Sequence, residues 1–320
     1  MTLLTVSGLS KRFTRGGLWR ASKGEVRAVN DVSFKLDAGE TLAIVGESGS
    51  GKSTTANLVM RLLDANSGRI DLMGEDITHM RGKALRDMRR HMQMVFQDPY
   101  ASLNPRMRIA ETVGEGLRVH APDMTRSQRL DRVAEVLDQC GMGAEAMTRY
   151  PHQFSGGQRQ RIGIARALAV SPRLLVLDEP VSALDVSVQA QILNLLRELQ
   201  RELGLAYLFI SHDLSVVRQV ARRVAVMFAG HMVEEGAIHD VFDTPRHPYT
   251  RGLLDARPIE HPDARQKQAS EPREMEDVAD QGCPYYFRCP QAQSDCRQFD
   301  SALSDEDHAV ACLHPITIGR

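Results

Sequence analysis

The sequence predicts an α/β fold with a parallel-sheet core, an antiparallel β-subdomain, an inserted helical subdomain and a small cysteine-rich C-terminal region. Continuous apolar runs at residues 42–45, 174–177 and 206–210 are typical of strands that are buried on both faces of a parallel sheet. Period-two alternation in residues 3–6 and 26–36 predicts antiparallel strands ahead of this core. Residues 109–147 show helical periodicity without strand signals, which predicts the helical subdomain.

The chain of 320 residues is long enough for about two domains. We expect a large domain over residues 1–255 and a C-terminal region over residues 256–320, with a linker at 257–281 and a cysteine cluster at 283–312. The formal net charge of −1 gives no basic surface typical of nucleic-acid binding. No apolar run approaches the roughly 18 to 20 residues that span a bilayer, and residues 1–13 lack the apolar core of a signal peptide. We therefore expect a cytoplasmic protein without a nucleic-acid partner.

A glycine-rich loop follows the first buried strand and has the composition of a phosphate-binding site. It consists of Gly46, Glu47, Ser48, Gly49, Ser50, Gly51, Lys52, Ser53 and Thr54. The glycines let backbone N–H groups turn towards phosphate oxygens, and the helix expected near Gly51 directs its positive dipole end at the same anion. Lys52 can reach the β- and γ-phosphates, and the Ser53 hydroxyl can ligate Mg²⁺. A Gly/Ser loop without a ligand is the alternative, but every fixed position of the motif is filled, which favours a nucleoside triphosphate.

The elements next to this loop follow an α/β alternation. Phe13, beside a basic loop between the antiparallel strands, either offers its ring to a purine base or packs in the core. Apolar residues at helical spacing predict a helix that ends at residues 66–68, before a strand at 69–73: Ala56, Val59, Met60 and Leu63. A charged helix near residues 81–90 precedes a strand at 92–96, which delivers Gln97 and a loop with two prolines. Gln97 can lie beside a metal or can cap the strand end.

The predicted helical subdomain extends over about residues 100–170, and an apolar face in it includes Leu130, Val133, Val136 and Leu137. Near its end lies a second glycine-containing turn, made by Ser155, Gly156, Gly157 and Gln158. Ser155 is a good N-cap, and the glycines expose the backbone at the positive end of the following helix. This stretch is either a second phosphate-binding helix end or a common turn.

Polar residues follow two of the buried strands at their carboxyl ends. Asp178 and Glu179 follow one strand, and His212 follows the next. Asp178 can enter a Mg²⁺ shell, and Glu179 can act as general base on an attacking water in phosphoryl transfer. Residues 182–185, ending at Asp185, cap a long helix whose apolar stripe belongs to the core. His212 is structural or catalytic, and its position favours function because ligands of open α/β sheets collect outside the carboxyl ends of strands.

Together these motifs occur in the order and spacing of an ABC-transporter ATPase, which the chain resembles over residues 1 to about 255. It is more similar still to the ATPase subunits of dipeptide and oligopeptide importers, and to the second of two paired ATPases, because Phe154 and residues 96–106 and 247–250 match that subgroup. The resemblance implies a P-loop NTPase core that binds ATP, with Ser53 and Gln97 meeting Mg²⁺ and with Asp185 in the nucleotide-binding set. It further implies that Phe13 stacks on adenine, that Glu179 is the base and that His212 senses the γ-phosphate.

The resemblance also implies partners. Ser155 and Gly157, with their neighbours in that turn, would act on nucleotide held by a homologous ATPase subunit, which makes a heterodimer the expected assembly. The loop at residues 97–106 would contact one of two transmembrane permease subunits. An extracytoplasmic solute-binding protein would complete an importer of peptides or a related solute, with this chain on the cytoplasmic face of the membrane.

Two rival functions remain open. A soluble ABC protein of translation or DNA repair usually has tandem cassettes or a long coiled coil, whereas this sequence has one cassette and no sustained heptads. An accessory scaffold of the kind that accompanies phosphonate-cleaving complexes resembles the same subgroup, and co-purification with permeases would distinguish it.

Four of the five cysteines crowd the C-terminal tail, whereas Cys140 stands apart. Cys283, Cys289, Cys296 and Cys312 are separated by gaps of five, six and fifteen residues. A reducing cytoplasm argues against two disulfides, and zinc favours closer cysteine pairs than these. Iron–sulfur clusters accept four cysteines with more varied gaps. Related peptide-importer ATPases carry such a tail with a [4Fe-4S] cluster, so the resemblance implies one here, with zinc and free thiols as the alternatives.

Overall fold

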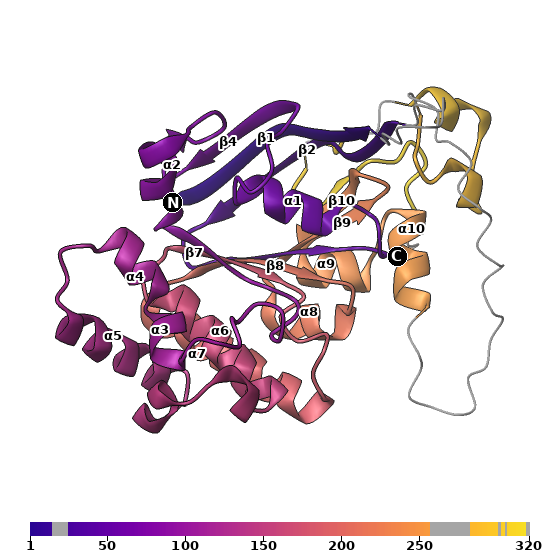
Figure 1. The fold of residues 1–320 in the computed structure, drawn as a ribbon. Helices are drawn as coiled ribbons and strands as arrows, with labels where there is room; N and C mark the ends of the chain where they lie inside the picture. Colours follow the sequence, from indigo (N-terminus) through magenta and orange to yellow (C-terminus); the bar gives the residue numbers. More distant parts are fainter. Residues whose placement is uncertain (15–24, 257–281, 300–301, 305, 318–320) are drawn as a thin grey trace, which may run out of the picture.

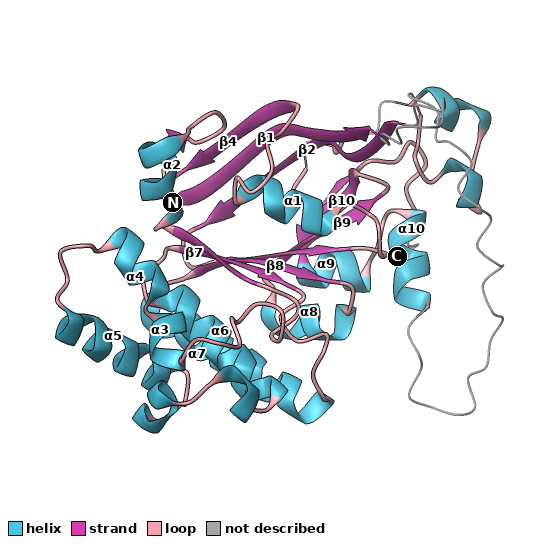
Figure 2. Ribbon diagram, viewed as in Figure 1, coloured by secondary structure: helices cyan, strands magenta, loops and turns pink. Residues whose placement is uncertain are grey.

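Two β-sheets organise the computed structural model, which describes residues 1–14, 25–256, 282–299, 302–304 and 306–317 (Figures 1 and 2). The basic loop expected after Phe13 and the expected linker at residues 257–281 lie outside the described residues.

The larger sheet has the strand order β11-β10-β9-β3-β8-β7-β6. Its strands are β3 (Thr41–Val45), β6 (Met92–Val95), β7 (Leu174–Asp178), β8 (Ala206–Ser211), β9 (Arg223–Phe228), β10 (His231–Ala237) and β11 (Ala309–Val310). Parallel pairing joins β3 to β8, β8 to β7 and β7 to β6. As predicted, β3, β7 and β8 are buried along their whole length. Because these strands run the same way, the residues that follow them gather at one edge of the sheet.

The smaller sheet is antiparallel, with the strand order β2-β1-β4-β5. Its strands are β1 (Thr2–Thr14), β2 (Glu25–Asp37), β4 (Ser67–Leu72) and β5 (Glu75–Asp76). The two N-terminal strands expected from the alternating pattern are present, and both are longer than the pattern indicates.

Helices pack on both faces of the larger sheet. They are α1 (Lys52–Val59), α2 (Gly82–Arg89), α3 (Ile109–Val113), α4 (Glu115–His120), α5 (Arg126–Gln139), α6 (Gly156–Leu168), α7 (Val186–Leu203), α8 (Leu214–Val220), α9 (Ile238–Asp243) and α10 (Pro248–Asp255), with 3₁₀ turns at Ala144–Thr148, Pro151–Gln153, Tyr286–Arg288 and Ser294–Gln298. Figure 1 shows α1 between the sheets and α3, α5, α6 and α7 below the larger sheet. The buried apolar residues accordingly form one cluster on each face of the larger sheet.

Two details of the sequence-based expectation are wrong. Helix α1 ends at Val59 and does not include Leu63, because Arg61 adopts a left-handed φ of 54° and turns the chain. The Arg61 guanidinium is buried there and donates hydrogen bonds to the Ile77 carbonyl (2.9 Å) and the Asp64 carboxylate (2.8 Å). Leu130, expected on the apolar face of α5, is 37% exposed.

The sequence pattern did not predict β9, β10 or β11, although β9 pairs directly with β3. None of the helices in the described ranges is long and apolar enough to cross a membrane.

Candidate functional site

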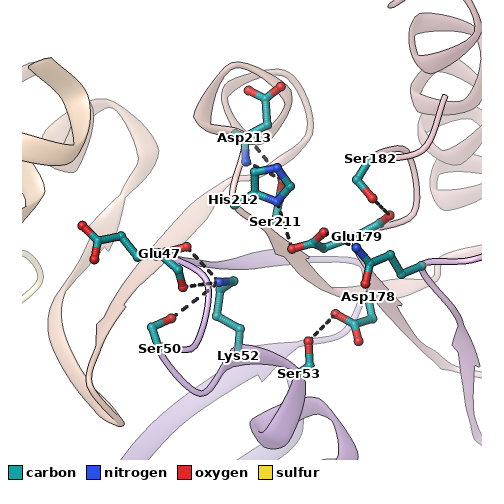
Figure 3. A network of polar contacts seen from close by, with 12 residues as sticks. Glu47, Ser50, Lys52, Ser53, Asp178, Glu179, Ser182, Ser211, His212 and Asp213 are labelled. Carbon is teal, nitrogen blue, oxygen red and sulfur yellow. Dashed lines mark hydrogen bonds and ion pairs between the residues drawn. The ribbon is translucent and has the colours of Figure 1, made fainter. Parts of the chain in front are cut away.

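The phosphate loop connects the end of β3 to the start of α1, with Gly51 as the N-cap and Lys52 as the first helical residue. The Lys52 ammonium lies inside the loop, where Nζ donates hydrogen bonds of 2.8 Å to the backbone carbonyls of Gly46 and Glu47 (Figure 3). Burial lowers the pKa of Lys52, although three nearby carboxylates oppose the shift. The loop therefore holds a cation where phosphate oxygens are expected.

Two glycines of the loop are required by close packing. Gly46 has a φ of 151°, and a Cβ there would lie 2.1 Å from the carbonyl oxygen of Met227 in β9. Gly51 has a φ of 107°, and a Cβ there would lie 2.2 Å from the carbonyl oxygen of Ala28 in β2. Backbone from both sheets therefore fixes the path of the loop, and no larger residue fits at either position.

Ser53 and Asp178 are brought together from distant parts of the chain. The Ser53 hydroxyl donates a hydrogen bond of 3.0 Å to Asp178 Oδ1 at the end of β7. Burial raises the pKa of Asp178, and the hydrogen bond from Ser53 opposes the shift only in part. A hydroxyl beside a carboxylate is an oxygen donor set of the kind that Mg²⁺ prefers, so these two residues fit the ion expected here.

Glu179 is held between Gln97 and His212. Its Oε2 accepts a hydrogen bond from Gln97 Nε2 (2.7 Å), and its Oε1 lies 2.9 Å from His212 Nδ1. The three residues follow β6, β7 and β8, neighbouring strands of the larger sheet. Because the Gln97 amide nitrogen donates to Glu179, its amide oxygen is the atom that can ligate a metal.

The backbone at Glu179 adopts a left-handed φ of 47°, which is uncommon for a residue other than glycine. Its N–H donates to the Ile210 carbonyl (2.9 Å), and its own carbonyl accepts from the Ser182 hydroxyl (3.1 Å). The neighbouring strand and the following turn therefore stabilise a conformation that costs free energy, as is common where function fixes a side chain.

The second glycine-containing turn forms a capped helix start. Ser155 is the N-cap of α6, and Ser155 and Gln158 form a reciprocal capping box. Gly157 packs against α7, where an added Cβ would lie 2.4 Å from Val188. The hydrogen bonds of this turn are internal to it, and α6 packs with α3, α5 and α7 on the other side of the sheet from α1 (Figure 1).

The remaining candidate residues lie as follows. Ser48 and Gly49 are exposed at the tip of the loop, Ser50 is buried and Thr54 is half-buried in α1. Asp185 is the N-cap of α7 but makes no side-chain cap hydrogen bond. Phe13, at the end of β1, is 40% exposed, and Lys11 Nζ lies 5.4 Å from its ring centroid.

Tyr249 contacts the phosphate loop, which the sequence pattern did not predict. Its hydroxyl accepts a hydrogen bond of 2.9 Å from the Glu47 backbone N–H. The residues 247–250 marked a subgroup in the sequence, but the pattern gave no indication of a contact about two hundred positions away.

The four tail cysteines line one pocket, together with His247 and His314. Burial, together with the other three thiols, raises the pKa of Cys283 to about 11. Four thiols that line one pocket are a donor set of the kind that thiolate-bound metal centres use.

Comparison with known proteins places this geometry in a family. Residues 29–182 match the family model "ABC transporter", and residues 233–296 match "Oligopeptide/dipeptide transporter, C-terminal region". The chain is 50% identical over 262 residues to the oligopeptide transport ATP-binding protein OppF of Bacillus subtilis, covering 82% of this chain and 84% of that protein. It is 44% identical to the di/tripeptide transport ATP-binding protein DppF of Pseudomonas aeruginosa, covering 98% of each.

Solved structures agree with the fold. The chain is similar to the ATP-binding cassette MJ0796, solved as a dimer bound to ADP and Pi, with a TM-score of 0.66 and 28% identity over 74% of this chain and 99% of that one. It is similar to cbiO1 of Clostridium perfringens, with a TM-score of 0.66 and 29% identity over 76% of this chain and 91% of that one. The phosphate loop, the paired sheets and these matches together show that the chain belongs to the ABC transporter family, in its oligopeptide and dipeptide branch.

Proposed function

We propose that this chain is the ATP-hydrolysing motor subunit of an importer for dipeptides, oligopeptides or a related solute. The observation that carries the proposal is the convergence of Glu179, Gln97 and His212 beside the phosphate loop, where a terminal phosphate would react. The functions of two relatives that are 50% and 44% identical to this chain over most of its length support the class of solute.

Each residue would have a distinct role in hydrolysis. Lys52 would bind the β- and γ-phosphates, and its buried position strengthens that attraction because little water competes. Glu179 would hold an attacking water and accept its proton, while His212 would orient the Glu179 carboxylate and contact the γ-phosphate. Ser53, Gln97 and Asp178 would hold Mg²⁺, which would neutralise charge on the phosphates.

Hydrolysis is proposed to need a second, homologous ATPase subunit, and the proposed assembly is a heterodimer of the two. The turn at Ser155 to Gln158 presents a capped helix start with a positive dipole end, suited to phosphate. Its hydrogen bonds are internal to the turn, so we assign it to nucleotide held by the partner. The dimeric cassette bound to ADP and Pi among the similar structures supports this assembly.

The loop after β6 is proposed to contact a transmembrane permease. Its aromatic residues Phe96 and Tyr100 are 43% and 62% exposed and would offer apolar surface to a partner. The Arg159 guanidinium lies 3.8 Å from the Tyr100 ring centroid, linking this loop to α6. Movement of α6 on ATP binding would thereby reach the permease. Two permeases and an extracytoplasmic solute-binding protein would complete the system, with this chain at the cytoplasmic face.

The tail cysteines are proposed to hold a [4Fe-4S] cluster with a structural or docking role. Zinc is the alternative, since Asp295, Cys296 and His314 offer ligand atoms within 4.8 Å of one another. Anaerobically purified protein should be brown, with about four iron and four sulfide per chain. Colourless protein with one zinc per chain would contradict the iron–sulfur cluster and support the zinc alternative.

Co-purification from membranes tests the proposed function. A tagged chain should bring two permeases and a second ATPase with it, and the complex should hydrolyse ATP. A chain that instead purified with soluble enzymes alone would favour the accessory scaffold of a phosphonate-cleaving type of complex.

A further inference from the structure

The C-terminal tail contacts the phosphate loop directly through Arg288. This residue lies in the 3₁₀ turn Tyr286–Arg288, immediately before Cys289. Its guanidinium forms a two-pronged ion pair with the Glu47 carboxylate, with Nη1 to Oε2 at 2.9 Å and Nη2 to Oε1 at 2.7 Å. Such a forked pair fixes the orientation of both groups, which a single contact would not do.

Glu47 is also held at both backbone groups. Its N–H donates to the Tyr249 hydroxyl at 2.9 Å, and its carbonyl accepts from Lys52 Nζ at 2.8 Å. The C-terminal part of the chain therefore holds the side chain and the amide of Glu47, while its carbonyl helps to place the lysine that faces the phosphates.

An aromatic platform supports this contact. The rings of Phe228 and Tyr249 lie 4.6 Å apart, and Tyr285 lies 5.2 Å and 5.4 Å from them. The Arg288 guanidinium lies 5.4 Å from the Phe228 ring and 5.6 Å from the Tyr285 ring. All three rings are buried, so the platform limits the conformations of the Arg288 side chain and favours the one that pairs with Glu47.

The charge of Glu47 explains why such a contact matters. A carboxylate in a loop that binds a triphosphate repels the ligand, and an adjacent guanidinium cancels that repulsion. We propose that Arg288 is a positioning residue for nucleotide binding, which neutralises and orients Glu47 and so makes the cysteine-bearing tail part of the ATP site. Because Arg288 precedes Cys289, the same contact ties the cysteine pocket to the phosphate loop.

The test compares ATP affinity in single and double variants. Arg288→Met keeps the apolar stem on the aromatic platform and removes the fork. Because both partners are more than a third exposed, water screens the pair, and we expect the dissociation constant of a fluorescent ATP analogue to rise only roughly three- to ten-fold. Adding Glu47→Gln to Arg288→Met should restore most of the lost affinity, because the repelling charge is gone. Arg288→Lys should fall between the wild-type chain and Arg288→Met.

Arg218→Met provides the matched control. It removes a comparably exposed ion pair, Arg218 with Asp243 at 2.9 Å, between α8 and α9. The thermal midpoint measured without nucleotide should move no further in Arg288→Met than in this control, and the control should bind the analogue normally. An unchanged affinity in Arg288→Met, or a loss that Glu47→Gln does not relieve, would overturn the proposal. A wild-type chain that binds no ATP would instead reject the nucleotide site itself.

Discussion

Glu179→Gln separates the chemical role of the carboxylate from its contacts. In the folded chain Glu179 accepts from Gln97 and meets His212 Nδ1. A glutamine can keep both contacts, because its oxygen accepts from Gln97 while its amide donates to His212 in the other tautomer. We therefore expect a change in folding free energy below about 1 kcal/mol, the net value of a typical hydrogen bond.

The effect on catalysis should be much larger. A glutamine cannot take a proton from water, and loss of a general base typically lowers a rate by about 10²- to 10⁴-fold. This corresponds to about 3 to 5 kcal/mol on the barrier, at about 1.4 kcal/mol for each factor of ten. The assay is steady-state phosphate release at saturating MgATP with the partner ATPase present, together with the dissociation constant of a fluorescent ATP analogue.

The control is Glu198→Gln, the same chemical change at an exposed position of α7. Glu179→Gln should bind nucleotide as well as this control does and should release almost no phosphate. Hydrolysis at the control rate would refute the assignment of Glu179 as the base.

Three further predictions test the site and the tail. Burial raises the pKa of Asp178 in the folded chain, so the ionised carboxylate destabilises the fold at high pH, and this destabilisation decreases as the carboxylate is protonated at lower pH. Asp178→Asn should therefore raise the thermal midpoint at pH 8 and raise it by less at pH 4. The same change should impair Mg²⁺-dependent hydrolysis. A midpoint that is lower at pH 8 would contradict this reasoning. The isolated chain should hydrolyse ATP poorly and gain roughly ten-fold or more when its partner ATPase is titrated in, because in the proposed assembly Ser155 would act on the partner's nucleotide and an oriented group supplied in trans contributes at least this much; full activity in a demonstrable monomer would be incompatible with a shared site. The metal proposed for the tail should be lost in Cys289→Ala and kept in the matched change Cys140→Ala, at a buried cysteine outside the pocket. In a chain that already carries Arg288→Met, loss of that metal should weaken ATP binding by less than two-fold more, since both changes act through the contact between Arg288 and Glu47.

The proximity of Gln97, Glu179 and His212 could be expected from the sequence because it rests on local patterns and one rule of topology. Buried apolar runs identified β3, β7 and β8, and parallel strands place the residues that follow them at one edge. Gln97, Glu179 and His212 could thus be grouped before any contact was known. The hydrogen bond between Ser53 and Asp178 follows from the same rule.

Other features depend on tertiary contacts that leave no periodic signal. The early end of α1 reflects a buried guanidinium at Arg61, whereas apolar spacing favoured a longer helix. The pairing of Glu47 with Arg288 joins residues 241 positions apart, and each is an ordinary surface charge by itself. The convergence of the four cysteines on one pocket was expected from the resemblance.

ATP-driven peptide uptake into proteoliposomes tests the central claim most directly. The complex purified through a tag on this chain would be reconstituted with its solute-binding protein and a mixture of dipeptides and oligopeptides, and peptides inside the vesicles would be identified by mass spectrometry. We predict that one class of peptide accumulates with ATP on the side that corresponds to the cytoplasm, and that Glu179→Gln abolishes the accumulation. Equal accumulation with the Glu179→Gln complex, or robust ATP hydrolysis without uptake of any peptide, would contradict the account.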